Sequence, residues 1–303
     1  MMAADGWYIY TGREAVPDYV TRVRIHESVS VIRARAFCRH PNIKVVECHD
    51  RVKTVGGWAF FICPSLRRVI MPGVEVVKQY AFEYCKALAI VECGKLEIIK
   101  VRAFSNTSLG SINLPFVKIV EHSAFSSCEA LTKIKFGGKL ESIRQWAFSG
   151  CTSLERITIP LKDGLITYDN VFRGCENLKH VDLVERSILD DTIDALQMED
   201  WKTDMDRDML SIDQILPNTS AGDDSDDVGG KALAIRMWIS SVLRKIIRYK
   251  AQHHSLLNEA ATTLQHALPQ DIMMNNVLPF LELPSFTFEG GGYEEEEEEA
   301  TER

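Results

Sequence analysis

Cysteines are the residues of this sequence whose type and spacing could most directly do chemistry, because thiolates bind metal ions and carry out redox reactions. Seven of the eight fall into two registers of a repeat. No C-x-x-C pair occurs and the histidines follow neither register, so the spacing does not favour a metal site or a redox ladder. Small, buried, apolar residues fit the pattern better. The first register holds Cys63, Cys85, Cys128, Cys151 and Cys175, and the second holds Cys48 and Cys93.

Catalytic motifs are absent from the sequence. Cys48, His49 and Asp50 include the residue types of a nucleophilic triad, but neighbours at the end of a strand point to different sides. There is no G-x-S-x-G, H-E-x-x-H, Walker A or G-x-G-x-x-G motif. We therefore expect a protein that is not an enzyme and uses no cofactor or metal.

A repeat of 21–24 residues positions the cysteines. An alanine precedes six of the seven repeating phenylalanines, a cysteine follows five of them three residues later, and a leucine or isoleucine comes three residues further on. In the fourth copy this spacing is one residue shorter, which gives Leu109, Ile112 and Leu114. The phenylalanines are Phe37, Phe60, Phe82, Phe104, Phe125, Phe148 and Phe172.

Each repeat ends in alternating apolar and polar residues, as in Leu154-Glu-Arg-Ile157-Thr-Ile159, which is typical of a short, half-buried strand. One strand about every 22 residues leaves too little chain for a full helical crossover. The spacing predicts a solenoid in which each strand stacks on the one before it, roughly 4.8 Å away. We expect the A-F-x-x-C segment to be a short helical return turn with its phenylalanine inward, and the strands to form one continuous sheet.

The pattern (V/L)-x-x-(I/V)-x-x-x-A-F-x-x-C-x-x-L-x-x-(I/V)-x-(L/I)-P resembles the BspA-type leucine-rich repeat and extends over about residues 15–185 in seven copies. With its helical, acidic C-terminal extension, the chain is similar to BspA-like proteins predicted from diatom genomes. The resemblance implies a leucine-rich repeat solenoid that acts as a protein-interaction scaffold. Bacterial surface members of the family are linked to adhesion, but no export signal is evident at the start of this sequence. We therefore expect an intracellular, cytoplasmic protein.

The predicted strand face suggests where a protein partner would bind, because solenoids use such extended faces for recognition. Three apolar residues are expected to point outward, which is unusual for a solvated surface, and a small basic cluster is expected beside them. The alternatives are that another segment covers the apolar group and that the basic group is only solvated. The candidate residues are Val45, Arg68, Ile70, Ile90, Lys133, Lys135 and Arg156.

The part of the chain after the repeats differs in charge and in period. Residues 1–185 hold 25 Lys and Arg against 19 Asp and Glu, whereas the remainder holds 10 against 24. Residues 1–14 are predicted to form an N-terminal cap segment. The predicted parts after the solenoid are an acidic helical segment at 186–217, an acidic linker at 218–230, a long basic amphipathic helix with a short terminal helix at 231–288, and a disordered Glu-rich tail at 289–303.

The two helical segments carry opposite charges, which favours an antiparallel, coiled-coil-like hairpin that caps the last repeat. A second reading is a calcium- and calmodulin-regulated adaptor acting through residues 236–250. In that reading Trp238, Val242 and Ile247 are the anchors of a helix that binds in a groove. No apolar run is long enough to span a membrane, and the small basic surplus does not favour nucleic-acid binding. The oligomeric state is not predicted.

Overall fold

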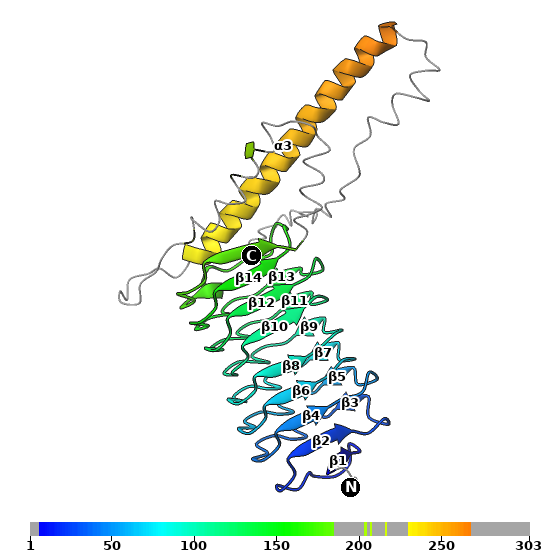
Figure 1. Cartoon of the computed structure of the whole chain (residues 1–303), viewed down its shortest axis with the longest axis vertical. Coiled ribbons are helices and arrows are strands. Elements are labelled where there is room, and N and C mark those ends of the chain that lie inside the picture. Colours follow the sequence, from blue (N-terminus) through cyan, green and yellow to red (C-terminus); the bar gives the residue numbers. More distant parts are fainter. Residues whose placement is uncertain (1–5, 185–202, 205–206, 208–215, 217–229, 268–303) are drawn as a thin grey trace, which may run out of the picture.

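The computed structural model describes residues 6–184, 203–204, 207, 216 and 230–267. Within 6–184 the chain winds into a solenoid of about seven turns, with one column of longer strands and one of shorter strands running side by side (Figure 1). The predicted solenoid and its parallel strands are thereby confirmed. The predicted linker up to residue 229, the terminal helix after residue 267 and the Glu-rich tail lie outside the described residues.

The column of longer strands carries the face that the sequence predicts. Apolar residues of these strands point inward, so that Val46 and Val69 are fully or almost fully buried while their neighbours point outward. The first five strands form one parallel sheet in the order β1-β2-β4-β6-β8. They are β1 (Tyr8–Tyr10), β2 (Arg22–Ile25), β4 (Val45–Glu47), β6 (Arg68–Ile70) and β8 (Ile90–Glu92).

The remaining longer strands form a separate parallel sheet, so the prediction of one continuous sheet is wrong. The break falls between β8 and β10, where the fourth turn is one residue short and the two backbones no longer stay in register. Val91 of β8 is consequently only half-buried, whereas the equivalent Val46 and Val69 are buried. The second sheet holds β10 (Ser111–Leu114), β12 (Lys133–Phe136), β14 (Arg156–Ile159) and β15 (His180–Leu183).

The short apolar pairs ahead of each phenylalanine form a third sheet, which runs without a break past the short turn. In each pair the second residue is buried and the first faces outward or sideways. The order is β13-β11-β9-β7-β5-β3. The strands are β3 (Val31–Ile32), β5 (Thr54–Val55), β7 (Val76–Val77), β9 (Ile98–Ile99), β11 (Ile119–Val120) and β13 (Ser142–Ile143).

The core of the solenoid is a stack of the seven repeating phenylalanine rings. Successive ring centroids lie 4.8 Å apart at Phe37–Phe60 and 5.6 Å apart at Phe148–Phe172. Adjacent rings are almost parallel, at 3° for Phe60–Phe82 and 9° for Phe104–Phe125. The stack continues across the short turn, where Phe82 and Phe104 are 5.2 Å apart. The prediction that the phenylalanines point inward is confirmed.

The return turns are not helical, so this prediction is wrong for all but the last complete turn, which contains the 3-10 helix η1 (Asp169–Phe172). In the other turns the residues two before and two after the phenylalanine adopt left-handed backbone conformations, as at Trp58 and Ile62, with φ of 56° and 55°. Two such residues reverse the chain in few positions, and backbone groups of each turn bond the next, as Phe60 N–H does to Ala81 O at 2.7 Å. L-residues rarely adopt this conformation, so each costs about 1–2 kcal/mol.

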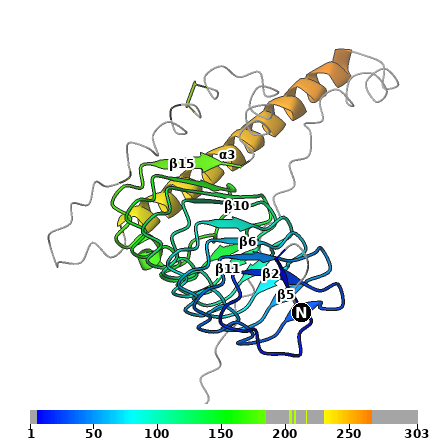
Figure 2. The same ribbon diagram turned by 60° about the horizontal axis from the view of Figure 1, so that its bottom comes forward.

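Both ends of the solenoid are covered. At the first end β1 pairs with β2, and the ring of Trp7 lies against the guanidinium groups of Arg22 and Arg24 at 4.1 and 4.6 Å. At the other end α3 (Gly230–Ala267) packs on η1 and extends its buried stripe from the core, whereas its distal part projects beyond the solenoid (Figure 2). The buried residues of α3 are Ala232, Ile235, Trp238, Ile239, Val242, Ile246 and Tyr249 among the uncharged ones.

Removing a ring from the middle of the stack is expected to lower stability strongly. Phe104→Ala leaves a cavity between two rings that cannot move together, since the backbone spacing is fixed, and should reduce the free energy of unfolding by about 3–5 kcal/mol. Phe116→Ala is the matched control, because this ring is 41% exposed. Denaturant unfolding of both variants measures the difference. Equal midpoints for the two would contradict a structural role for the stack.

The left-handed residues give a second prediction. Arg39 has φ of 59° and an exposed side chain, and the equivalent positions in later turns are occupied by Gly150 and Gly174. Arg39→Gly should therefore be more stable than Arg39→Ala by about 1 kcal/mol, because glycine relieves the left-handed strain and loses only part of that gain to its freedom in the unfolded chain. Thermal melts of the pair test this. A more stable alanine variant would contradict the prediction.

Candidate interaction surfaces

The apolar part of the predicted strand face lies on the first sheet. Val45, Ile70 and Ile90 come from the adjacent strands β4, β6 and β8, and all three point away from the core. Ile90 is 49% exposed, while Val45 and Ile70 are half-buried among their neighbours. The strand register places Arg68 between Val45 and Ile90 in one outward row, and it places Ile70 between Glu47 and Glu92 in the other. The three apolar residues therefore alternate with charged ones on three adjacent strands, the last of which borders the break between the two sheets.

Ion pairs surround this apolar group. Arg24 Nη2 lies 3.1 Å from Glu47 Oε2, and Arg68 Nε donates to Glu92 Oε1 at 3.0 Å. Each pair joins residues of neighbouring strands. Because these side chains are partly exposed, each pair contributes only about 0–1 kcal/mol to stability. Arg68, one of the candidate residues, thus has its charge balanced by Glu92.

The basic part of the face lies on the second sheet and has two components. Lys133 and Lys135 of β12 are exposed, and no ion pair joins either of them to another residue in the described part of the chain. Arg156 of β14 donates to Asp182 Oδ1 at 2.7 Å, so its charge is balanced. The free positive charge of the strand face therefore belongs to β12, across the sheet break from Ile90.

The predicted groove-binding anchors on α3 do not share one surface. Trp238 is 5% exposed and Val242 is fully buried, whereas Ile247 is 64% exposed. The first two belong to the stripe that continues the solenoid core. They would be available to a partner only if α3 left the last turn.

Polar contacts hold α3 on the last turn as well. The ammonium of Lys231 is buried and donates to the carbonyl oxygens of Cys175, Glu176 and Leu178 at 2.6, 2.8 and 3.1 Å. Arg236 forms an ion pair with Asp169 of η1. Charged groups bonded in this way fix the position of the helix, since moving it would leave a buried ammonium without acceptors.

Asp204, within the predicted acidic helix, contacts α3. Asp204 accepts hydrogen bonds from the Tyr249 hydroxyl and from Lys245 Nζ, the latter at 3.0 Å. These hydrogen bonds, that of Tyr249 first, lower the pKa of the Asp204 carboxyl below its ordinary value. The contact agrees with a pairing of acidic and basic segments, although most of residues 186–217 lie outside the described residues.

Sequence reasoning missed a row of arginine and aromatic side chains at the return turns. Its members occupy the left-handed position two residues before each phenylalanine. Equivalent side chains of successive turns therefore lie one above the other. Arg35 lies over the Trp58 ring at 5.4 Å, and Trp58 stacks on Tyr80 at 5.0 Å. Arg102 follows at the same position and forms an ion pair with Glu83. Burial raises the pKa of the Glu83 carboxyl. The position before A-F in the repeat was the signal that would have found the row.

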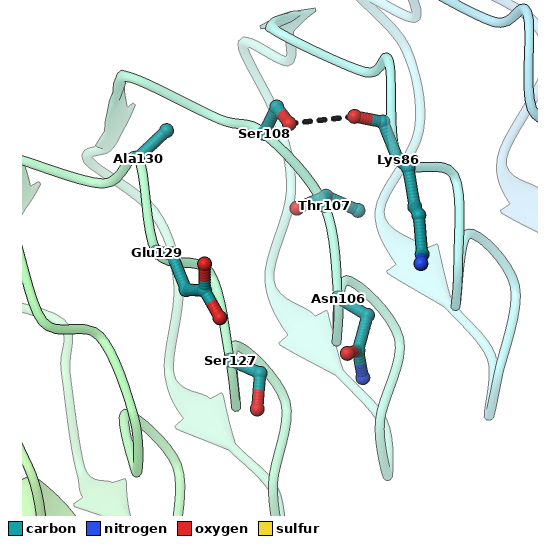
Figure 3. Close-up of a pocket in the computed structure, with 7 residues that line it drawn as sticks. All are labelled: Lys86, Asn106, Thr107, Ser108, Ser127, Glu129 and Ala130. Atoms are coloured by element: carbon teal, nitrogen blue, oxygen red, sulfur yellow. Dashed lines mark hydrogen bonds between the residues drawn. The ribbon is translucent and has the colours of Figure 1, made fainter.

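A polar notch opens at the short fourth turn (Figure 3). It has a volume of about 390 Å³ and is lined by three successive turns. Lys86 and Glu129 lie on opposite sides of Asn106 and Thr107, as the close-up shows. The remaining lining residues are Ser108, Ser127 and Ala130. The sequence showed the one-residue deletion but gave no indication of a hollow there.

The first-register cysteines are structural, as expected. Each lies at a return turn and its thiol donates to the carbonyl of the previous turn's phenylalanine, as Cys85 Sγ does to Phe60 O at 2.9 Å. Thr107 takes the cysteine's place in the short turn and lies 3.2 Å from Cys128 Sγ. Burial raises the pKa of Cys48 and Cys93, in the second register, to about 12. These thiols are therefore protonated and unreactive at neutral pH.

Two searches over the described residues bear on other functions. No group of three or more histidine, cysteine, aspartate or glutamate residues in this part of the chain is arranged to hold a metal ion. No helix within it combines the length and the apolar character needed to cross a membrane.

Comparison with known proteins identifies the repeat. The family described as the BspA type leucine rich repeat region matches residues 18–119 and 98–193, with six copies. The sequence matches none of the curated proteins.

Solved structures of other repeat proteins are also similar. A leucine-rich repeat protein from Bacteroides ovatus is 24% identical, with 55% of this chain and 43% of that one covered and a TM-score of 0.46. The T. pallidum leucine-rich repeat protein is 22% identical, with coverages of 60% and 77% and a TM-score of 0.39. The pneumococcal vaccine antigen PcpA is 17% identical, with coverages of 58% and 65% and a TM-score of 0.32. The match thus spans less than half of the Bacteroides ovatus protein.

Burial predicts the reactivity of the cysteines. Cys38 is half-buried and the other seven are buried, so native protein treated with iodoacetamide at pH 8 should be alkylated at Cys38 and, after unfolding in urea, at all eight positions. Peptide mass analysis gives the sites. Rapid native alkylation of Cys63 or Cys128 would contradict the assignment.

The pKa of Cys48 and Cys93 gives a separate prediction for the pH dependence of stability. Because the folded pKa of these two thiols lies near 12 against an ordinary 9.0, the free energy of unfolding should be unchanged below pH 9 and fall as the pH rises toward 12.

Proposed function

Because the chain belongs to the BspA-type leucine-rich repeat family, we propose that it is a non-catalytic protein-interaction scaffold that binds a partner through the strand face. The strand face is defined by Val45, Arg68, Ile70, Ile90, Lys133, Lys135 and Arg156. Its strands stack in parallel and present two outward residues each, which is the kind of extended surface that solenoids use for recognition. An intracellular location stays part of this proposal.

The observation that carries the proposal is the exposed Ile90, which shares the outward face of the first sheet with Val45 and Ile70. The lysines of β12 lie two strands further on, beyond the sheet break and β10. Burial of exposed apolar side chains against a partner lowers the free energy of the complex. The surrounding arginines are already paired with carboxylates, so Lys133 and Lys135 are the charges left for a partner. A partner with an apolar centre and an acidic margin fits both parts.

Two alternatives remain. The first is an adhesion or ligand-binding module, as the bacterial surface members of the family suggest. A calcium- and calmodulin-regulated adaptor acting through residues 236–250 would require α3 to leave the solenoid, since Trp238 and Val242 are buried in the contact. The cost of exposing Lys231 and this stripe makes the adaptor the weaker alternative.

The strand face is tested by charge placed on its apolar centre. The full-length double variant Ile70→Glu with Ile90→Glu should capture a stoichiometric partner from the source lysate at least tenfold less than the unchanged protein. Val31→Glu is the matched control, because Val31 is a β-branched residue, 46% exposed, on the other sheet. Circular dichroism melts establish that both variants fold.

A separate variant tests the basic part. Lys133→Glu with Lys135→Glu should weaken the same partner and reduce the salt dependence of binding, since two positive charges are lost. If the partner is retained equally by both double variants and by the control, the strand face is not the binding surface.

A further inference from the structure

The fourth turn departs from the repeat in a way that creates the notch. In the other turns of this type two residues separate the cysteine from the leucine, as Lys86 and Ala87 separate Cys85 from Leu88. Ser108 alone separates Thr107 from Leu109. The phenylalanine rings stay stacked through this turn, so the neighbouring turns cannot move together to close the gap that the missing residue leaves. The space stays open between the turn of Lys86 and that of Glu129.

The short turn also lacks a hydrogen bond. In each of the five cysteine-containing turns the leucine N–H donates to the cysteine carbonyl, as Leu88 does to Cys85 at 2.9 Å and Leu131 to Cys128 at 3.0 Å. No such bond forms between Leu109 N–H and Thr107 O among the described contacts. The short turn therefore lacks the backbone hydrogen bond that closes the cysteine-containing turns.

The charges at the notch are free and opposite in sign. No ion pair or side-chain hydrogen bond engages the Lys86 ammonium or the Glu129 carboxylate within the described part of the chain. The two residues are two turns apart, a distance of roughly 10 Å along the stack, which their flexible side chains can shorten. Between them lie the hydroxyl of Ser127 and the amide of Asn106, whose Nδ2 also donates to Ser105 Oγ at 2.9 Å (Figure 3). The Ser108 hydroxyl donates to Lys86 O at 2.6 Å, so it can only accept a further hydrogen bond.

This arrangement selects the ligand by charge. A simple anion would be attracted by Lys86 but repelled by Glu129, and a simple cation would meet the reverse. A molecule that carries a carboxylate and an ammonium together is attracted by both walls. The volume of about 390 Å³ lies at the lower end of the range for small-molecule sites and exceeds what one water needs.

We propose that the notch formed by Lys86, Asn106, Thr107, Ser108 and Glu129 binds a small zwitterion, of which a free α-amino acid is the simplest. The ligand carboxylate pairs with Lys86 and its ammonium with Glu129, while Asn106 bonds the atoms between. The notch lies at the return turns and its occupation does not depend on the partner proposed for the strand face.

Titration of the isotopically labelled full chain, followed by nuclear magnetic resonance, tests the proposal. The probes are glycine, L-serine and L-glutamine, each added alone. Saturable shifts are expected for the amides of Asn106, Thr107 and Ser108. N-acetylglycine lacks the ammonium and glycinamide lacks the carboxylate, so each should bind at least fivefold more weakly than glycine.

Variants locate the binding. Lys86→Met and Glu129→Gln should each weaken it at least fivefold, and Lys95→Met, an exposed lysine outside the notch, should leave it unchanged. Insertion of one alanine after Thr107 restores the spacing of the other turns and should abolish binding while the melting temperature is kept or raised. The charge-reversed pair Lys86→Glu with Glu129→Lys should bind the zwitterion again, in the opposite orientation.

Three results would overturn the proposal. The first is the absence of saturable shifts at Asn106, Thr107 and Ser108 with every zwitterion. The second is equal binding by Lys86→Met, Glu129→Gln and the unchanged chain. The third is binding of N-acetylglycine as tight as that of glycine, because the carboxylate alone would then account for it.

Discussion

The stack of seven phenylalanine rings is the constraint on which the rest of the structure depends. Rings 4.8–5.6 Å apart and nearly parallel fix the rise of every turn, and this rise is also the spacing at which parallel strands bond. The three sheets, the thiol contacts and the hydrogen bonds between return turns all follow from it. A turn without its ring would leave a void that neither neighbour can fill, so each turn depends on the one before and after it.

The fourth turn shows what the stack tolerates. Phe104 stays in the stack, and the sheet from β3 to β13 runs past it without a break. The missing residue therefore changes the structure only after Phe104, on the way to the longer strand, where it has two effects. The longer strands divide into two sheets between β8 and β10, and a polar notch opens beside Thr107. A deletion that costs the core little therefore changes the surface in two places.

Ion pairs join several neighbouring strands of the solenoid. Arg24, Arg68 and Arg156 each have a carboxylate partner on a neighbouring strand. Ile90 and Lys133 are exposed on the strand face, and the proposal of a protein partner rests on them. Burial raises the pKa of Cys48 and Cys93 to about 12, so these two thiols are protonated at neutral pH. At the C-terminal end of the solenoid, Lys231 of α3 donates a hydrogen bond to the Cys175 carbonyl of the last turn. The apolar stripe of α3 is therefore packed on the solenoid and is not exposed to a partner in this structure.

The sequence by itself determined the solenoid, its inward phenylalanines and its buried cysteines, because the same spacing recurs in every repeat. It also determined the long helix, through the spacing of three to four residues between its apolar side chains. It also placed Ile90 and Lys133 outward, since alternation along a strand has a fixed period of two. Only the tertiary structure decided the rest. Left-handed turns replaced the expected helical ones, the short turn split the sheet, and Trp238 became buried rather than available. These outcomes depend on contacts between neighbouring turns or between distant segments, and no local pattern of residues encodes such contacts.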